Sequence, residues 1–73
     1  MTRPAPFDLL DVVALVSEVP DHGLVRGQVG TLVEGLAEGV WLVEFADRAG
    51  RTYAMVELDE EVLLALHFEA AAA

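Results

Sequence analysis

Short runs of β-branched and aromatic residues, separated by glycine and proline, place the strongest limit on the fold of this chain. Four such runs occupy 11–17, 26–34, 40–45 and 51–57. Residues of these types fit the pleated surface of a strand, and runs of this length are too short for confident helices. Several short strands with turn residues between them are typical of a small barrel. The sequence therefore predicts an all-β fold, a small SH3-like barrel of about five strands.

The chain of 73 residues has room for one domain. We expect the barrel to span residues 9–68. Residues 1–8 hold Pro4 and Pro6 and are expected to form a flexible leader, and the alanine-rich segment 69–73 is expected to be a tail. No run of apolar residues approaches the roughly 20 needed to cross a membrane, so the chain is predicted to be soluble.

Three glycines have predicted structural roles. Gly27 suits a turn with a positive φ, and Gly50 stands at the end of a tight hairpin connection over 47–50. Gly30 lies inside a strand, which indicates either a bulge or a close approach of another backbone. A small barrel needs such corners.

The C-terminal part of the domain is predicted less fully. Residues 58–62 are expected to form a short helical turn with Asp59 as its N-cap, because acidic side chains favour the first turn of a helix. Residues 63–68 fit a strand or a continuing helix equally well, and their apolar spacing does not decide between the two.

The pattern along each strand predicts the core and a surface for a partner. Alternation of side chains places one set inside: Val12, Val29, Val33, Val43, Phe45, Ala54 and Val56. Hydrophobic residues make up 55% of the chain, which is more than so small a domain can bury. We therefore expect an exposed interface: Val13, Leu15, Leu42, Trp41 and Tyr53. The alternative is that Phe7, Leu9, Leu66 and Phe68 fold back over these residues.

The charge of the chain restricts its partners. Thirteen acidic residues against four arginines, with no lysine, give a net charge of −9. Nucleic acids and anionic membranes need a basic surface, so neither is an expected partner. A basic protein is electrostatically favoured, and a second copy of the chain is the other expected partner. The simpler interpretation is that the acidic residues only keep the domain soluble.

No motif indicates catalysis or a cofactor. A metal site would need both His22 and His67 with a carboxylate, because cysteine is absent. The acidic run 59–61 fits a helix start better than an acid/base pair, and no lysine accompanies the glycines as in a phosphate loop. The aromatic residues are better explained as core than as a base-stacking platform. We predict a cytoplasmic, non-catalytic protein without cofactors.

Several motifs together resemble a known family. They are Leu-Leu-Asp-Val-Val-Ala-Leu from Leu9, Pro-Asp-His-Gly-Leu from Pro20, and Arg-Gly-Gln-Val-Gly-Thr-Leu-Val-Glu from Arg26. The later segments Val43–Phe45, Gly50–Ala54 and Leu63–Leu64 fit the same pattern. This set is similar to the bacterial domain of unknown function 4926 over residues 9–66. The resemblance implies an SH3-like fold, a small stand-alone gene product and no established catalytic residues. Some relatives look like partners encoded beside toxins.

Two functions follow as expectations. The chain is expected to be a small acidic protein-protein interaction module, such as the antitoxin or immunity partner of a basic toxin. The alternative is an accessory or regulatory subunit of a larger enzyme complex, a role that SH3-like barrels also fill.

Overall fold

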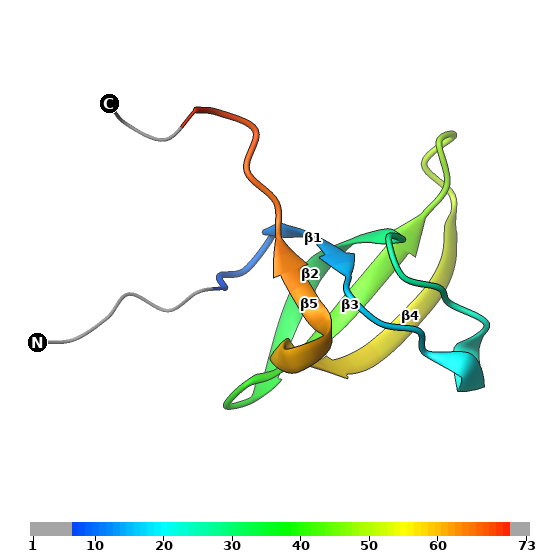
Figure 1. The fold of residues 1–73 in the computed structure, drawn as a ribbon, viewed down its shortest axis with the longest axis horizontal. Helices are drawn as coiled ribbons and strands as arrows, with labels where there is room; N and C mark the ends of the chain where they lie inside the picture. The colour runs from blue at the N-terminus through cyan, green and yellow to red at the C-terminus, as the bar shows by residue number, and fades with distance from the viewer. Residues whose placement is uncertain (1–6, 71–73) are drawn as a thin grey trace, which may run out of the picture.

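Five antiparallel strands form one sheet in the computed structural model, which describes residues 7–70. Two single turns of 3-10 helix, η1 and η2, interrupt the loops. The elements are β1 (Val12–Leu15), η1 (Pro20–His22), β2 (Val29–Ala37), β3 (Val40–Ala46), β4 (Thr52–Asp59), η2 (Glu60–Val62) and β5 (Leu63–Ala65). Their order across the sheet is β4-β3-β2-β1-β5. Figure 1 labels each strand.

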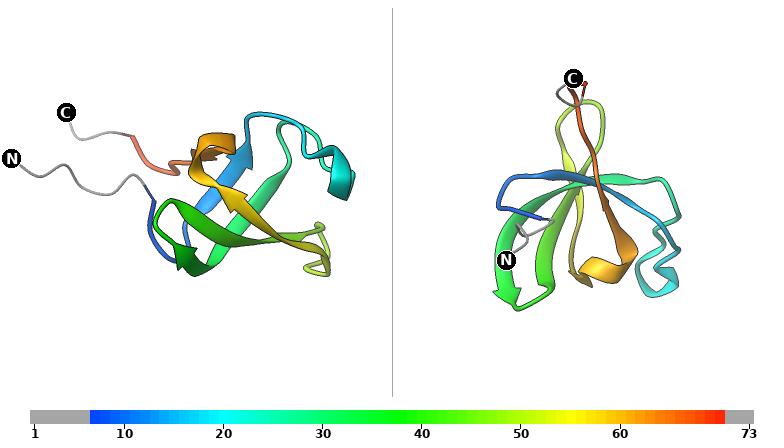
Figure 2. Two further views of the ribbon diagram at one scale, coloured as in Figure 1. Left: turned by 90° about the horizontal axis from the view of Figure 1, so that it is seen from below. Right: turned by 60° about the vertical axis from the view of Figure 1, so that its left-hand side comes forward.

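The connection between β4 and β5 explains why this sheet rolls into an SH3-like barrel. These strands are the two ends of the sheet, and in a flat sheet they would lie about 19 Å apart across four strand spacings. From Asp59 to Leu63 the chain can span only about 14 Å. The sheet must therefore curve, and Figure 2 shows that curvature from two further directions. The predicted fold class is confirmed.

The core lies on the concave side of the sheet. Its buried apolar side chains come from all five strands, from Leu24 in the loop before β2, and from Phe7. The strand members are Val13, Leu15, Leu32, Val43, Phe45, Val56, Leu58 and Leu63. For β3 and β4 the predicted core is confirmed, with Val43, Phe45 and Val56 buried and Ala54 packed against them.

For β1 and β2 the predicted side of the strand was wrong. Val13 and Leu15, predicted to be exposed, are 0% and 2% exposed, whereas the predicted core residue Val29 is 46% exposed. Val12 and Val33, also predicted for the core, are only partly buried. Both faces of β1 are apolar in the sequence, so the alternation alone did not indicate which face is covered.

Gly30 decides which face of β2 points inward. It pairs with Val13 on one side and with Phe45 on the other, in the row of residues that face the core. A Cβ at Gly30 would lie 2.7 Å from Cγ1 of Val43 and 3.0 Å from Cε1 of Phe45. The register shifts of β2 occur later, after Leu32, so the glycine serves a close approach rather than a bulge.

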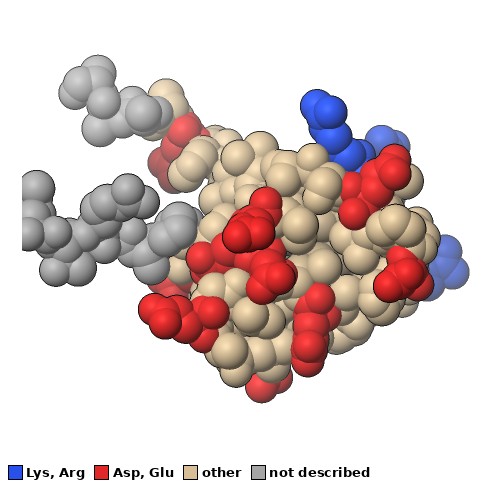
Figure 3. All heavy atoms as spheres, turned by 60° about the horizontal axis from the view of Figure 1, so that its bottom comes forward, with Lys and Arg blue, Asp and Glu red and all other residues tan. Residues whose placement is uncertain are grey.

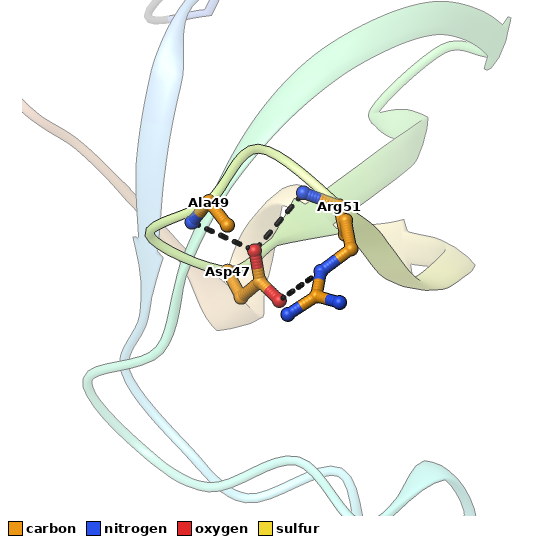
Figure 4. A network of polar contacts seen from close by, with 3 residues as sticks. All are labelled: Asp47, Ala49 and Arg51. Carbon is orange, nitrogen blue, oxygen red and sulfur yellow. Dashed lines mark hydrogen bonds and ion pairs between the residues drawn. The ribbon is translucent and has the colours of Figure 1, made fainter.

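The hairpin between β3 and β4 has the predicted tight turn over 47–50. Asp47 Oδ1 accepts hydrogen bonds from the backbone N–H groups of Ala49 and Arg51, at 2.9 and 3.0 Å (Figure 4). Its Oδ2 lies 3.4 Å from Nε of Arg51. Gly50 has a φ of +84°, and Gly27 in the loop before β2 has a φ of +95°. Gly27 therefore has the positive φ that the sequence predicts, and Gly50 ends the hairpin connection as predicted.

The two ends of the domain differ from the prediction in detail. The helical turn is η2, which begins after Asp59, but the Asp59 side chain makes no capping hydrogen bond. The segment 63–68 begins as a strand, and the N–H of Leu66 extends the pairing by donating to Val12 O. Most of the expected leader and tail, residues 1–6 and 71–73, lies outside the described residues. Phe7, assigned to the flexible leader, is instead buried in the core.

Candidate protein-binding face

An uncharged surface covers the convex side of β5, β1 and the start of β2. Leu64 pairs with Ala14, and Ala14 pairs with Val29, so these three side chains form one outward row. The next row joins Val12 to Thr31, and Leu66 extends it through its backbone hydrogen bond to Val12. We call this surface the apolar face, and it consists of Val12, Ala14, Val29, Thr31, Leu64 and Leu66.

The apolar face is exposed to solvent at both ends of its first row. Leu64 is 54% exposed and Val29 is 46% exposed, with the small side chain of Ala14 between them. Soluble monomers rarely expose large continuous apolar surfaces, and such surfaces commonly mark contacts with other proteins. This makes the apolar face the best candidate for a binding site.

Acidic side chains border the apolar face on its β3 side. Glu44 stands opposite Thr31 on the neighbouring strand, and Leu42 stands between its two partners Glu34 and Glu57. We call the outward residues Glu34, Leu42, Glu44 and Glu57 the acidic rim. Figure 3 shows acidic side chains spread over one side of the molecule, with the basic ones gathered at one end.

The residues predicted as one interface do not lie together. Val13 and Leu15 are in the core, and Trp41 is partly buried and packs against the core. Leu42 lies on the outward side, half-buried within the acidic rim. Tyr53 is half-exposed on β4, next to the loop that precedes β2. The prediction of an apolar surface has a counterpart in the apolar face, but its residues were misassigned.

Two aromatic residues of the predicted interface have polar partners within the domain. The indole N–H of Trp41 donates to Oε2 of Glu60 at 2.7 Å, which connects β3 to η2. The hydroxyl of Tyr53 accepts from Nε2 of Gln28 at 2.9 Å, and its ring lies 6.3 Å from that of Phe45. Both contacts hold the strands to neighbouring loops, so each aromatic residue has a structural role of its own.

The alternative prediction was that the two ends of the chain fold back over the apolar surface, and the structure shows this only in part. Phe7 enters the core and Leu66 joins the apolar face at its edge. Leu9 stays largely exposed, and Phe68 is 77% exposed on a segment that leads away from the barrel in Figure 1. Within residues 7–70 the ends therefore leave Leu64 and Val29 uncovered.

The other surface features of the described residues do not bring together groups that indicate a binding or catalytic site. A shallow hollow at the turn between β2 and β3 is lined by Glu38, Gly39, Asp59, Glu60 and Glu61. His22 and His67 are exposed on separate segments, and the described residues contain no cluster of three or more potential metal ligands. None of the helices in the described part of the chain is long and apolar enough to cross a membrane.

The sequence did not lead to the prediction that the residues of the apolar face form an exposed surface, since Val12 and Val29 were predicted for the core. The usable signal was Gly30, because a glycine inside a run of β-branched residues indicates a close neighbour on its side of the strand. In the structure Gly30 pairs with the buried Phe45, so this side faces the core. Counting by twos from Gly30 places Leu32 inside and leaves Val29 and Thr31 outside. Pairing with β1 then turns Val12 and Ala14 outward, which sequence alone did not provide.

Comparison with known proteins identified one family model. The model described as Domain of unknown function (DUF4926) matches residues 9–65, most of the chain. No curated protein and no solved structure matched the sequence.

Proposed function

The chain belongs to the DUF4926 family, whose description assigns no activity, and from this premise we propose that it is a non-catalytic module that binds another protein. The observation that carries the proposal is the apolar face, where Leu64, Ala14 and Val29 form one row of apolar side chains that is exposed at both ends. A partner that covers this row removes apolar surface from water, which is the main driving force of protein association.

The acidic rim favours a partner with basic residues around an apolar contact. Glu44 and Glu57 lie on the strands that follow the apolar face, and the chain as a whole has a net charge of −9. Complementary charge raises the rate of encounter and excludes acidic partners. A basic toxin is one partner of this kind, with the present chain as its antitoxin or immunity protein. An accessory subunit of an enzyme is the alternative, and we place either role in the cytoplasm.

Capture from the source cells with matched variants tests the proposal. The wild-type chain and the variant Leu64→Asp are used as baits, and Val25→Asp serves as the control. Val25 is exposed to a similar degree as Leu64 but lies in the loop before β2, outside the apolar face. We expect a partner retained by the wild type and by Val25→Asp but lost with Leu64→Asp.

Hydrogen exchange then locates the contact on the complex. Binding should slow exchange in β1, β5 and the first residues of β2, and added salt should weaken the complex because the rim charges are screened. Equal capture by all three baits, or protection confined to the β3–β4 hairpin, would contradict the proposal.

A further inference from the structure

Among residues 7–70, no second strand pairs with the outer edge of β4. The strand stands at one end of the sheet and pairs with β3 alone (Figure 1). Within the described residues, the backbone hydrogen bonds made outside the strand ladders involve none of residues 52–59. An edge of eight residues without proline or lysine is a template for pairing with another strand.

The register shows which backbone groups point away from the sheet. At the end of β4 the N–H of Glu60 points toward β3 and donates to the Gly39 carbonyl, while its C=O accepts from Leu63 N–H at η2. In an antiparallel ladder this direction alternates along the strand. Every second residue of β4 therefore directs its N–H and C=O groups away from β3. Starting next to Glu60, these residues are Asp59, Glu57 and Met55, and their groups point to the open edge.

The charge of the side chains along this edge changes from positive at one end to negative at the other. Arg51 stands just before β4, the half-exposed Tyr53 and Met55 follow, and Glu57 and Asp59 stand at the far end. A uniformly basic peptide would match only the acidic end. An antiparallel copy of the same strand matches both ends at once, because its basic end meets the acidic end of the first.

We propose that two copies of this chain pair antiparallel through their β4 edges, with Met55 at the two-fold axis and Asp59 of each copy opposite Arg51 of the other. In this register Glu57 stands opposite Tyr53, so no carboxylate faces another one. The edge-directed backbone groups of Met55 meet those of its own copy, which closes a hydrogen-bonded pair at the axis. The result is a continuous ten-stranded sheet that leaves both apolar faces open for other partners.

The contact between Arg51 and Asp47 within one chain does not oppose this arrangement. It joins Nε to Oδ2 at 3.4 Å, and the Arg51 side chain is 81% exposed. Exposed ion pairs of this kind contribute little, so the guanidinium can exchange partners. The hairpin turn keeps its own bonds, because Asp47 Oδ1 accepts from backbone groups.

Sedimentation equilibrium of charge-reversal variants tests the dimer and its register. The variants are Arg51→Glu, Asp59→Arg and the two combined, measured at about 0.15 M salt so that the repulsion between two acidic chains is screened. We expect a dimer for the wild type and about tenfold weaker dimerisation for each single variant, because each charge reversal replaces two symmetric attractions with two repulsions between like charges. The double variant restores the pairs with exchanged charges and should dimerise as the wild type does.

Matched controls separate the edge from general effects of charge. Arg48→Glu and Glu61→Arg make the same changes of charge off the β4 edge, and they should leave dimerisation unchanged. Met55→Lys places two ammonium groups at the axis and should give a monomer. Leu64→Asp should still dimerise, although under the proposed function this variant no longer binds the protein partner of the apolar face.

Three results would overturn the edge dimer. The first is a wild-type chain that stays monomeric up to about 1 mM, where even weak association is detected. The second is a double variant as weak as the single ones. The third is a dimer abolished by Leu64→Asp but kept by Met55→Lys, which would move self-association to the apolar face.

Discussion

Replacing Gly30 with alanine tests the packing between β2 and β3. The added Cβ would lie 2.7 Å from Cγ1 of Val43 and 2.9 Å from the carbonyl oxygen of Glu44. The side chain can move by a small rotation, but the oxygen belongs to the strand that pairs with β2. Overpacking a rigid site costs about 1 to 3 kcal/mol, and a clash with backbone places Gly30→Ala near the upper end.

That cost is large for a domain of this size. A chain of 73 residues has a free energy of unfolding of roughly 4 to 11 kcal/mol. A loss of about 3 kcal/mol should lower Tm by roughly 12 to 24 °C. Thermal and urea unfolding, followed by circular dichroism and by the fluorescence of Trp41, would measure it.

Gly35→Ala is the matched control on the same strand. There the new Cβ would lie 3.5 Å from Cζ3 of Trp41, which is an ordinary contact. This variant should be as stable as the wild type or gain about 0.4 to 1 kcal/mol, because alanine restricts the unfolded chain. If Gly30→Ala melts at the wild-type temperature, the close approach of β2 and β3 is not as tight as described. Equal losses at both glycines would instead indicate a general intolerance of β2 to alanine.

Three further substitutions have expected outcomes that unfolding experiments can check. Phe45→Ala should lose about 3 to 5 kcal/mol because the ring is fully buried in the core, and a loss below about 1 kcal/mol would remove it from the core. Asp47→Ala should lose about 1 to 2 kcal/mol with its two backbone hydrogen bonds, and more than Arg51→Ala, which removes only an exposed ion pair. Trp41→Phe should lose about 1 to 3 kcal/mol with the hydrogen bond to Glu60, and no loss would mean that water replaces it.

Local chemistry made much of the fold predictable from the sequence. The hairpin over 47–50 was identified because Asp47 and Gly50 favour a turn in any context, and both do so here. The inward side of β3 was clear because Val43 and Phe45 alternate with Glu44, so only one face is apolar throughout. The family match rests on the sequence as well.

The sequence by itself determined the all-β class, the turns, the acidic charge and the inward face of β3, since each depends on neighbouring residues. Tertiary structure alone decided the face of β1, where Val12 and Val13 are chemically equal and only pairing with Gly30 turns Val13 inward. It also decided that residues 63–65 are a strand, because their apolar spacing fits two periods and β1 supplies the hydrogen-bonding partner. The apolar face is a product of these long-range pairings, which bring Leu64, Ala14 and Val29 together from distant parts of the chain.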